Sequence, residues 1–161
     1  MDAFVEEVDD AKSHLLKRVI FWPAKWTAFN VPGVNWAWQS IPFRQSSVSA
    51  VPDNQHGVYS FSLCPQVSSH PQNSLLIYIG KAEKMTLRKR FESYFDEAKN
   101  AKRSSIGYMF RKYKDNLVFC YSVIPNTALI VKAEDALLSA MIPICNERFP
   151  AAVSKIIRGI R

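Results

Sequence analysis

The sequence has few cysteines and lacks both a long hydrophobic run and a basic leader segment. Its three cysteines, Cys64, Cys120 and Cys145, are far apart, which fits neither a zinc site nor a disulfide framework. No apolar run approaches the roughly 20 residues that cross a membrane. The first residues are acidic, whereas a secretory signal begins with basic residues. We therefore expect a cytoplasmic protein with no membrane partner.

Composition and charge favour a globular protein that binds polyanions. The 161 residues, 48% of them hydrophobic and 22% charged, suffice for one ordinary domain with a sizeable core. The formal net charge is +7, and basic side chains are concentrated in residues 81–114. That segment forms either a solvated helical surface or a surface that faces the phosphates of a nucleic acid.

Composition divides the chain into three parts. Residues 1–50 are predicted to form an N-terminal helix, over residues 2–20, and an aromatic-rich arm that packs on the domain. The arm is otherwise irregular and contains all four tryptophans, which either pack on the domain or stack on exposed bases. Residues 51–150 form the main domain, and residues 151–161 form a basic C-terminal tail.

The main domain has an α+β pattern. Runs rich in apolar, β-branched and aromatic residues predict strands at residues 57–63, 74–80 and 117–124. Apolar residues at helical spacing predict helices at residues 86–100 and 126–141, with a shorter helix or turn at 104–114. We therefore expect a small three-stranded antiparallel sheet flanked by helices.

The carboxylate of Glu134 is the most informative single group. It lies beside the apolar stripe of the predicted helix at residues 126–141, one turn from Ile130 and Leu138. An unpaired buried carboxylate is costly, so Glu134 is protonated, paired with a cation or bound to a metal. Hard divalent cations prefer such carboxylate oxygens.

Two arginines of the predicted helix at residues 86–100 point in different directions. Arg90 flanks the apolar stripe with Tyr94 one turn further, so both can reach one target at the sheet edge. Arg88 lies one turn from Glu92, which we expect to hold it on the solvent side. A guanidinium suits phosphate because it stays charged and donates two parallel hydrogen bonds. The alternative is that both arginines are ordinary surface charges.

Two tyrosines lie on neighbouring predicted strands. Alternation places Tyr59 on an apolar face with Phe61, as a core tyrosine whose hydroxyl reaches the rim. Tyr78 shares a face with Gly80, and a glycine there permits close backbone approach or starts a turn. Neither tyrosine by itself indicates an enzyme.

The order of these residues resembles the GIY-YIG nuclease superfamily. Gly57-Val58-Tyr59 looks like the first motif of that family. The second motif is similar to Tyr78-Ile79-Gly80-Lys81-Ala82, in the form found in the N-terminal incision domain of bacterial excision-repair nucleases. The run from Leu87 to Phe95 resembles the catalytic helix of that subfamily. The spacing of its metal-binding glutamate, proline and asparagine is kept by Glu134, Pro143 and Asn146.

The resemblance implies a GIY-YIG-like fold and a hydrolase of phosphodiester bonds, with one Mg²⁺ or Mn²⁺ per active site held by Glu134. Tyr59 would help to deprotonate the attacking water, which requires a lowered pKa or a proton relay. Arg90 would neutralise developing charge. The implied catalytic residues are Tyr59, Tyr78, Arg90 and Glu134. The implied positioning residues are Lys81, Tyr94 and Arg88, and the supporting residues are Gly57, Gly80 and Asn146.

The chain departs from the family pattern in two places. The loop between Tyr59 and Tyr78 is longer than usual, and a short insertion near residues 83–86 separates Tyr78 from Arg90. Counting from Tyr78 selects Arg88 as the catalytic arginine, whereas counting back from the Ser-Tyr-Phe run selects Arg90. The helical face favours Arg90.

We therefore expect a stand-alone DNA endonuclease of restriction, defence or mobile-element type, acting as a monomer or homodimer. RNA remains an alternative substrate. One active site nicks, whereas a double-strand cut needs a dimer or two encounters. Two other hypotheses stay open. The chain is a non-catalytic nucleic-acid-binding module of the same fold, or a basic interaction protein whose tail touches an acidic partner or a membrane surface.

Overall fold

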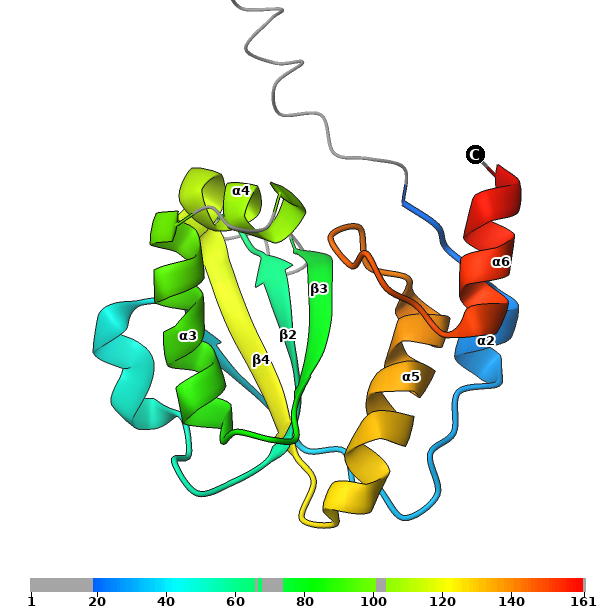
Figure 1. Cartoon of the computed structure of the whole chain (residues 1–161), viewed down its shortest axis with the longest axis horizontal. Helices are drawn as coiled ribbons and strands as arrows, with labels where there is room; N and C mark the ends of the chain where they lie inside the picture. The colour runs from blue at the N-terminus through cyan, green and yellow to red at the C-terminus, as the bar shows by residue number, and fades with distance from the viewer. Residues whose placement is uncertain (1–18, 66, 68–73, 101–103, 161) are drawn as a thin grey trace, which may run out of the picture.

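The computed structural model describes residues 19–65, 67, 74–100 and 104–160. These residues form an α+β fold in which helices cover both faces of a four-stranded antiparallel sheet (Figure 1). The strands are β1 (Trp38–Pro42), β2 (Gly57–Leu63), β3 (Leu75–Ala82) and β4 (Leu117–Val123), in the order β1-β4-β2-β3. The α-helices are α2 (Pro23–Thr27), α3 (Leu87–Asn100), α4 (Ser104–Tyr113), α5 (Ile130–Met141) and α6 (Ala151–Ile160). Short 3-10 helices are η1 (Gln45–Ala50), η2 (Lys114–Asn116) and η3 (Thr127–Leu129).

The strands and helices predicted within residues 57–141 are confirmed. The helix predicted from residue 126 begins as η3 and continues as α5, with Asn126 as its cap. The Asn126 Oδ1 accepts a hydrogen bond of 3.1 Å from the backbone N–H of Ala128. The helix predicted at residues 2–20 lies, up to residue 18, outside the described part of the chain. None of the helices in the described part is long and apolar enough to cross a membrane.

The prediction of a three-stranded sheet is wrong, because β1 adds a fourth strand. It pairs antiparallel with β4, from Trp38 opposite Ser122 to Pro42 opposite Val118. The segment around it was predicted to be irregular because of its prolines, a Pro32-Gly33 turn and a serine-rich stretch. In the structure the side chains of β1 are mostly exposed. Proline is tolerated here since β1 lies at the edge of the sheet, where a missing N–H breaks no ladder.

The two faces of the sheet bury different kinds of side chain. The face under α3 and α4 buries mainly aromatic residues, namely Phe43, Tyr59, Phe61, Phe91, Tyr94, Phe110 and Phe119. The face under α5 buries aliphatic residues, namely Val58, Ile79, Ile124, Ile130, Leu137 and Leu138. Successive side chains of a strand point to opposite faces, so β2 and β3 each contribute to both layers.

The aromatic arm is partly packed on this domain. Trp36 is half-buried against the aliphatic layer and stacks on Trp38 with ring centroids 5.9 Å apart. Helix α2 contacts α5. Trp26 and Trp38 remain 43% and 41% exposed. The expectation that the tryptophans pack on the domain therefore holds better for Trp36 than for these two.

A sharp turn after α5 brings the chain back along the outer edge of β3. Ile142 ends the helix with φ 45°, a left-handed conformation that is strained for a β-branched residue. The proline that follows cannot continue the helix. Cys145 then donates its backbone N–H to the carbonyl of Ile77 at 2.8 Å. The chain that follows α5 is thereby fixed against β3.

Candidate active site at the edge of strand β3

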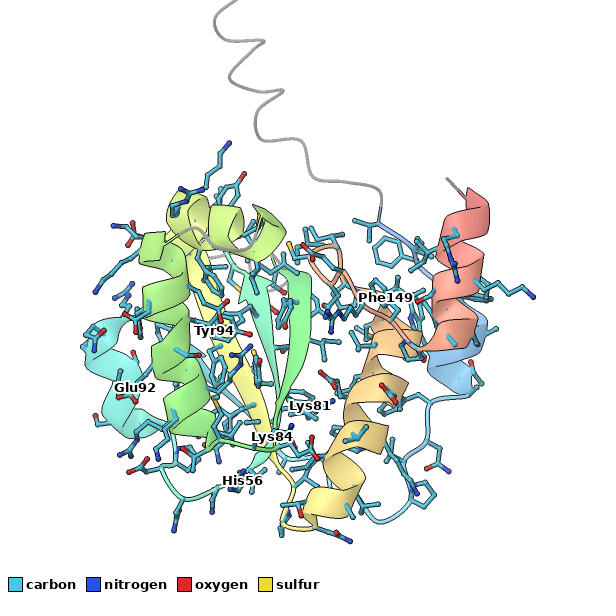
Figure 2. All side chains as sticks on the ribbon, in the orientation of Figure 1. His56, Lys81, Lys84, Glu92, Tyr94 and Phe149 are labelled. Atoms are coloured by element: carbon cyan, nitrogen blue, oxygen red, sulfur yellow. The ribbon has the colours of Figure 1, made fainter. Side chains whose placement is uncertain are left out.

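Strand β3 carries predicted site residues on both of its faces. Tyr78 and Gly80 lie on the face covered by α3 and α4, whereas Lys81 points toward α5 (Figure 2). A cavity of about 520 Å³ opens along this edge. Its lining includes Tyr78, Lys81, Glu134, Asp135, Asn146 and Arg148. The structure therefore brings residues from three separate motifs to one opening.

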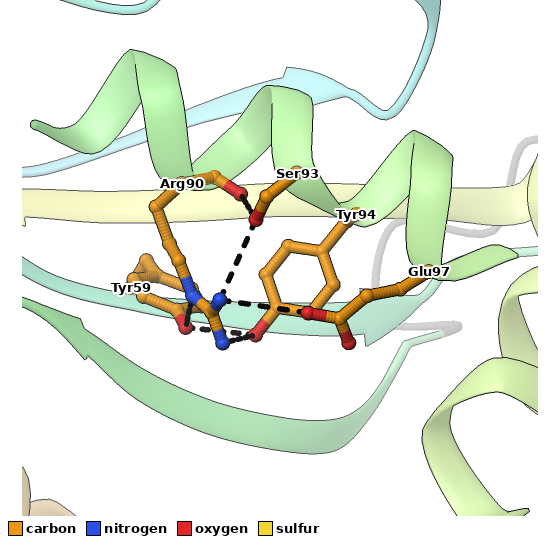
Figure 3. A network of polar contacts seen from close by, with 5 residues as sticks. All are labelled: Tyr59, Arg90, Ser93, Tyr94 and Glu97. Carbon is orange, nitrogen blue, oxygen red and sulfur yellow. Dashed lines mark hydrogen bonds and ion pairs between the residues drawn. The ribbon is translucent and has the colours of Figure 1, made fainter. Parts of the chain in front are cut away.

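Arg90 lies at the centre of a polar network between α3 and β2 (Figure 3). Its Nε donates to the Tyr59 hydroxyl at 2.8 Å, and its Nη2 donates to the Tyr94 hydroxyl at 3.0 Å. The two hydroxyls share a hydrogen bond of 2.7 Å. Nη1 reaches Ser93 Oγ at 3.4 Å and Glu97 Oε1 at 3.5 Å. Arg90 and Tyr94 thus meet at one target, as their spacing predicts, but that target is Tyr59 on the inner strand β2 and not a group at the sheet edge.

Tyr78 connects this network to the cavity. Its ring centroid lies 6.4 Å from that of Tyr59 and 6.3 Å from that of Tyr94. Tyr78 also lines the cavity, whereas Tyr59, Arg90 and Tyr94 do not. The guanidinium of Arg90 does not line the cavity, and 16% of its side chain is exposed.

Burial determines the protonation of this network. Tyr59 is 1% exposed, and desolvation, with a further contribution from Tyr78, raises its pKa well above the ordinary value despite Arg90. Burial likewise raises the pKa of Tyr94. Burial alone would lower the pKa of Arg90, but Tyr59, Tyr94 and Glu97 together raise it. Tyr59 is therefore a neutral phenol, and the lowered pKa that a direct role as base requires is absent.

The motif glycines are explained by close packing. A Cβ at Gly80 would overlap the hydroxyl of Tyr59, whose ring crosses the backbone of β3 at that point. A Cβ at Gly57 would overlap the carbonyl oxygen of Ser122 on β4. Both positions require glycine because a side chain has no room there. Gly80 in particular allows the Tyr59 hydroxyl to reach Arg90.

The carboxylate of Glu134 is paired across the gap between α5 and β3. Lys81 Nζ donates to Glu134 Oε2 at 2.6 Å, and the two side chains are 33% and 15% exposed. Burial lowers the pKa of Lys81, but the hydrogen bond and the charge of Glu134 outweigh it and raise the pKa overall. Of the three states expected for Glu134, the structure shows the ion pair.

The donor set at this cavity fits a magnesium or manganese ion with few protein ligands. Among the described residues, no three His, Cys, Asp or Glu side chains are grouped closely enough to hold a metal ion. Glu134 and the neighbouring Asp135 both line the cavity. Mg²⁺ commonly binds through one or two carboxylates and keeps water and substrate phosphate as its other ligands. Glu134 is the residue that would hold such an ion.

Asn146 braces the edge of β3. Its Nδ2 donates to the carbonyl of Ile79 at 2.8 Å, and its Oδ1 accepts from the N–H of Ile79 at 2.9 Å. The side-chain amide therefore replaces the peptide group of an adjacent strand. Together with the bond from Cys145 to Ile77, it covers the outer edge of β3 and holds Tyr78 and Lys81 in register.

Arg88 is not part of this site. Its Nε donates to the carbonyl of Val51 at 2.7 Å, and its Nη2 donates to that of Ser49 at 3.3 Å. Its Nη1 lies 3.4 Å from a carboxylate oxygen of Asp53. Arg88 therefore ties η1 and the residues after it to α3, it does not line the cavity, and none of the hydrogen bonds and ion pairs among the described residues joins it to its expected partner Glu92.

Three residues near the site were not predicted from the sequence. Glu97 contacts Arg90 from two turns further along α3. Residues seven apart lie on the same face of a helix, so this pair could have been predicted from the sequence. Asp135 and Arg148 line the cavity. No pattern in the sequence marked Arg148, because its position follows from the turn after α5.

Comparison with known proteins finds no match to this chain among family models, curated proteins or solved structures.

Proposed function

We propose that this protein is a metal-dependent endonuclease of GIY-YIG-like fold that hydrolyses phosphodiester bonds, with DNA as the preferred substrate. The order of the motifs in the sequence supports the proposal. One structural observation carries it further. The cavity at the β3 edge gathers Tyr78, Lys81 and Glu134, and Tyr78 contacts the network that holds Arg90.

The residues around the cavity suit a phosphodiester. Glu134 would hold Mg²⁺ or Mn²⁺, and the bound ion supplies polarisation of a phosphoryl oxygen. When substrate enters, the ammonium group of Lys81 leaves Glu134 and donates a hydrogen bond to a phosphate oxygen instead. The hydroxyl of Tyr78 donates a hydrogen bond to the substrate at the mouth of the cavity. Arg90 contributes positive charge from the network that Tyr78 contacts, where low solvent exposure strengthens its field.

Tyr59 has a different role in this proposal from that of a base. Its raised pKa keeps the hydroxyl protonated, so it orients Arg90 rather than removing a proton from water. Gly80 and Tyr94 fix the hydroxyl from two sides. The effect of Tyr59 on catalysis is therefore exerted through the guanidinium.

The alternative is a non-catalytic nucleic-acid-binding module, and one observation favours it. The guanidinium of Arg90 donates to Tyr59, Tyr94, Ser93 and Glu97, so its hydrogen bonds are made within the protein. A module that only binds nucleic acid does not need an arginine whose hydrogen-bond donors are available to a transition state. Cleavage and binding assays on the same preparation separate the two functions.

The test is nicking of supercoiled plasmid in Mg²⁺ or Mn²⁺ by the full chain. Glu134→Gln should lower the nicking rate by roughly 100-fold or more, as expected for loss of a metal or charge-stabilising group. Glu92→Gln makes the same chemical change at an exposed position of α3 and should leave the rate within about twofold. Equal nicking by the wild type and Glu134→Gln would defeat the assignment. Binding without cleavage in either metal would establish the non-catalytic module.

A further inference from the structure

A second cavity, of about 510 Å³, lies between the end of β1, helices α3 and α4, and η2. Its volume is that of a site for a small organic ligand. None of the residues that line it belongs to the candidate active site. Neither the motif order nor the proposed cleavage chemistry gives this cavity a role.

One side of this cavity is aromatic. Phe43 and Phe95 stack with ring centroids 4.4 Å apart and planes 6° from parallel. Phe110 lies 5.1 Å from Phe43 behind them. Phe43 and Phe110 are buried and fix the wall, whereas Phe95 is half-buried and leaves part of its ring open to the cavity. The open part of the Phe95 ring is an apolar surface of the kind on which a planar ring stacks.

The rim of the same cavity is basic. Arg44, Lys99, Arg111 and Lys114 line it, and Asp115 is the one acidic residue among its lining side chains. All four basic side chains are exposed. In the part of the chain that the structure describes, no salt bridge pairs any of them with a carboxylate. Clustered cations repel one another, and a bound anion relieves that repulsion.

We propose that this cavity binds one nucleotide of a single-stranded nucleic acid, with its phosphates at the basic rim and its base against Phe95. Sites for single strands combine basic grooves with aromatic platforms, because every base has a face that can stack. The bases of a duplex are stacked on each other and do not reach such a wall. The choice of nucleic acid among polyanions rests on the proposed function, whereas the attraction of the rim for phosphate does not.

The position of the cavity connects it to the candidate active site. Helix α4 contributes Ile106 to the first cavity and both Phe110 and Arg111 to the second. Ile106 and Phe110 are four residues apart, which is about 6 Å along a helix. Helix α4 therefore lines both cavities.

Binding is measured with the full chain, a fluorescein-labelled oligonucleotide of ten thymidines, and a chelator in place of metal. The variant Arg111→Gln/Lys114→Gln removes two rim charges, and Lys132→Gln/Lys155→Gln removes two exposed charges on α5 and α6. Loss of two phosphate contacts should weaken binding roughly 25-fold in 0.1 M salt and reduce the slope of log K against log salt by about 1.4. The control variant should stay within about twofold of the wild type.

A second oligonucleotide, with abasic sites in place of the thymidines, tests for the base. It should bind the wild type at least about fivefold more weakly than the normal oligonucleotide. Equal affinity for the two oligonucleotides, or equal losses in the rim variant and its control, would overturn the proposal. Because no metal is present, binding is read independently of cleavage. Loss of binding in the rim variant supports the second cavity even if the wild type cuts no substrate.

Discussion

The substitution Gly80→Ala tests the packing on which the Arg90 network depends. An added Cβ would lie 2.6 Å from Cζ of Tyr59 and 3.0 Å from Cε1 of Tyr78, and it would overlap the Tyr59 hydroxyl. The Tyr59 ring cannot easily retreat, because it is fully buried and stacks on Phe119 at 5.3 Å. The variant must therefore move the hydroxyl away from Arg90 or separate β2 from β3.

The expected loss of stability follows from two contributions. Overpacking of a well-packed core costs about 1–3 kcal/mol. Displacing the Tyr59 hydroxyl weakens its bonds to Arg90 and Tyr94, each of which contributes about 1 kcal/mol. Replacing glycine also restricts the unfolded chain, which offsets about 0.4–1 kcal/mol. We expect a net loss of about 3 kcal/mol, or a melting temperature about 6–12 °C lower for a chain of this size.

Denaturant unfolding and calorimetry measure this loss, and Gly159→Ala is the matched control. Gly159 lies in α6 with no heavy atom within 4 Å of a built Cβ. Alanine there should leave stability unchanged or raise it by up to about 1 kcal/mol. If Gly80→Ala is as stable as the wild type and nicks plasmid equally well, the close contact between Gly80 and Tyr59 does not hold Arg90.

Three further predictions concern other parts of the site. Asn146→Ala removes both side-chain bonds to Ile79 and should cost about 2 kcal/mol, with faster amide hydrogen exchange at Ile79; unchanged exchange there contradicts the brace. Burial raises the pKa of Tyr59 and Tyr94 above the unfolded value near 10, so stability should be fully present below about pH 10. It should then fall by up to about 2.7 kcal/mol per pH unit, and a flat denaturation profile between pH 9 and 11 argues against this burial. Arg88→Gln should destabilise the chain by about 1–2 kcal/mol through its lost bonds to residues 49–53 while the folded variant still nicks; inactive but stable protein would return Arg88 to the catalytic residues.

Local patterns were sufficient for most of the secondary structure. The strand at residues 57–63 and the helices around Arg90 and Glu134 follow from side-chain periodicity, which reports how a segment meets its core. Strand β1 escaped because it lies at the edge of the sheet with most of its side chains exposed, so its sequence shows no alternation. Such a segment becomes a strand because a partner strand pairs with it, and that partner, β4, lies about eighty residues away in the sequence.

Local periodicity also made part of the candidate site predictable. The shared direction of Arg90 and Tyr94 follows from helix geometry alone, and both reach one hydroxyl in the structure. The partner of Glu134 could not be chosen from the sequence, because many cations were available and only the packing of α5 on β3 selects Lys81. The partner of Arg88 was predicted wrongly. Its position on the helix pointed to Glu92, but the side chain instead contacts Val51, in a segment for which no regular structure was predicted.

The amino-acid sequence was enough to predict the helical or strand periodicity of each main element, the basic character of the chain and the order of the motif residues. Which of those residues meet depends on how the chain folds. The tertiary structure placed the Tyr59 hydroxyl over Gly80, enclosed it in aromatic side chains and so raised its pKa, which changes its proposed role from a base to a support for Arg90. It also formed a basic, aromatic cavity from segments far apart in the chain. The physical reason is that periodicity is a local property, whereas burial, pKa and cavity shape depend on neighbours that only folding brings together.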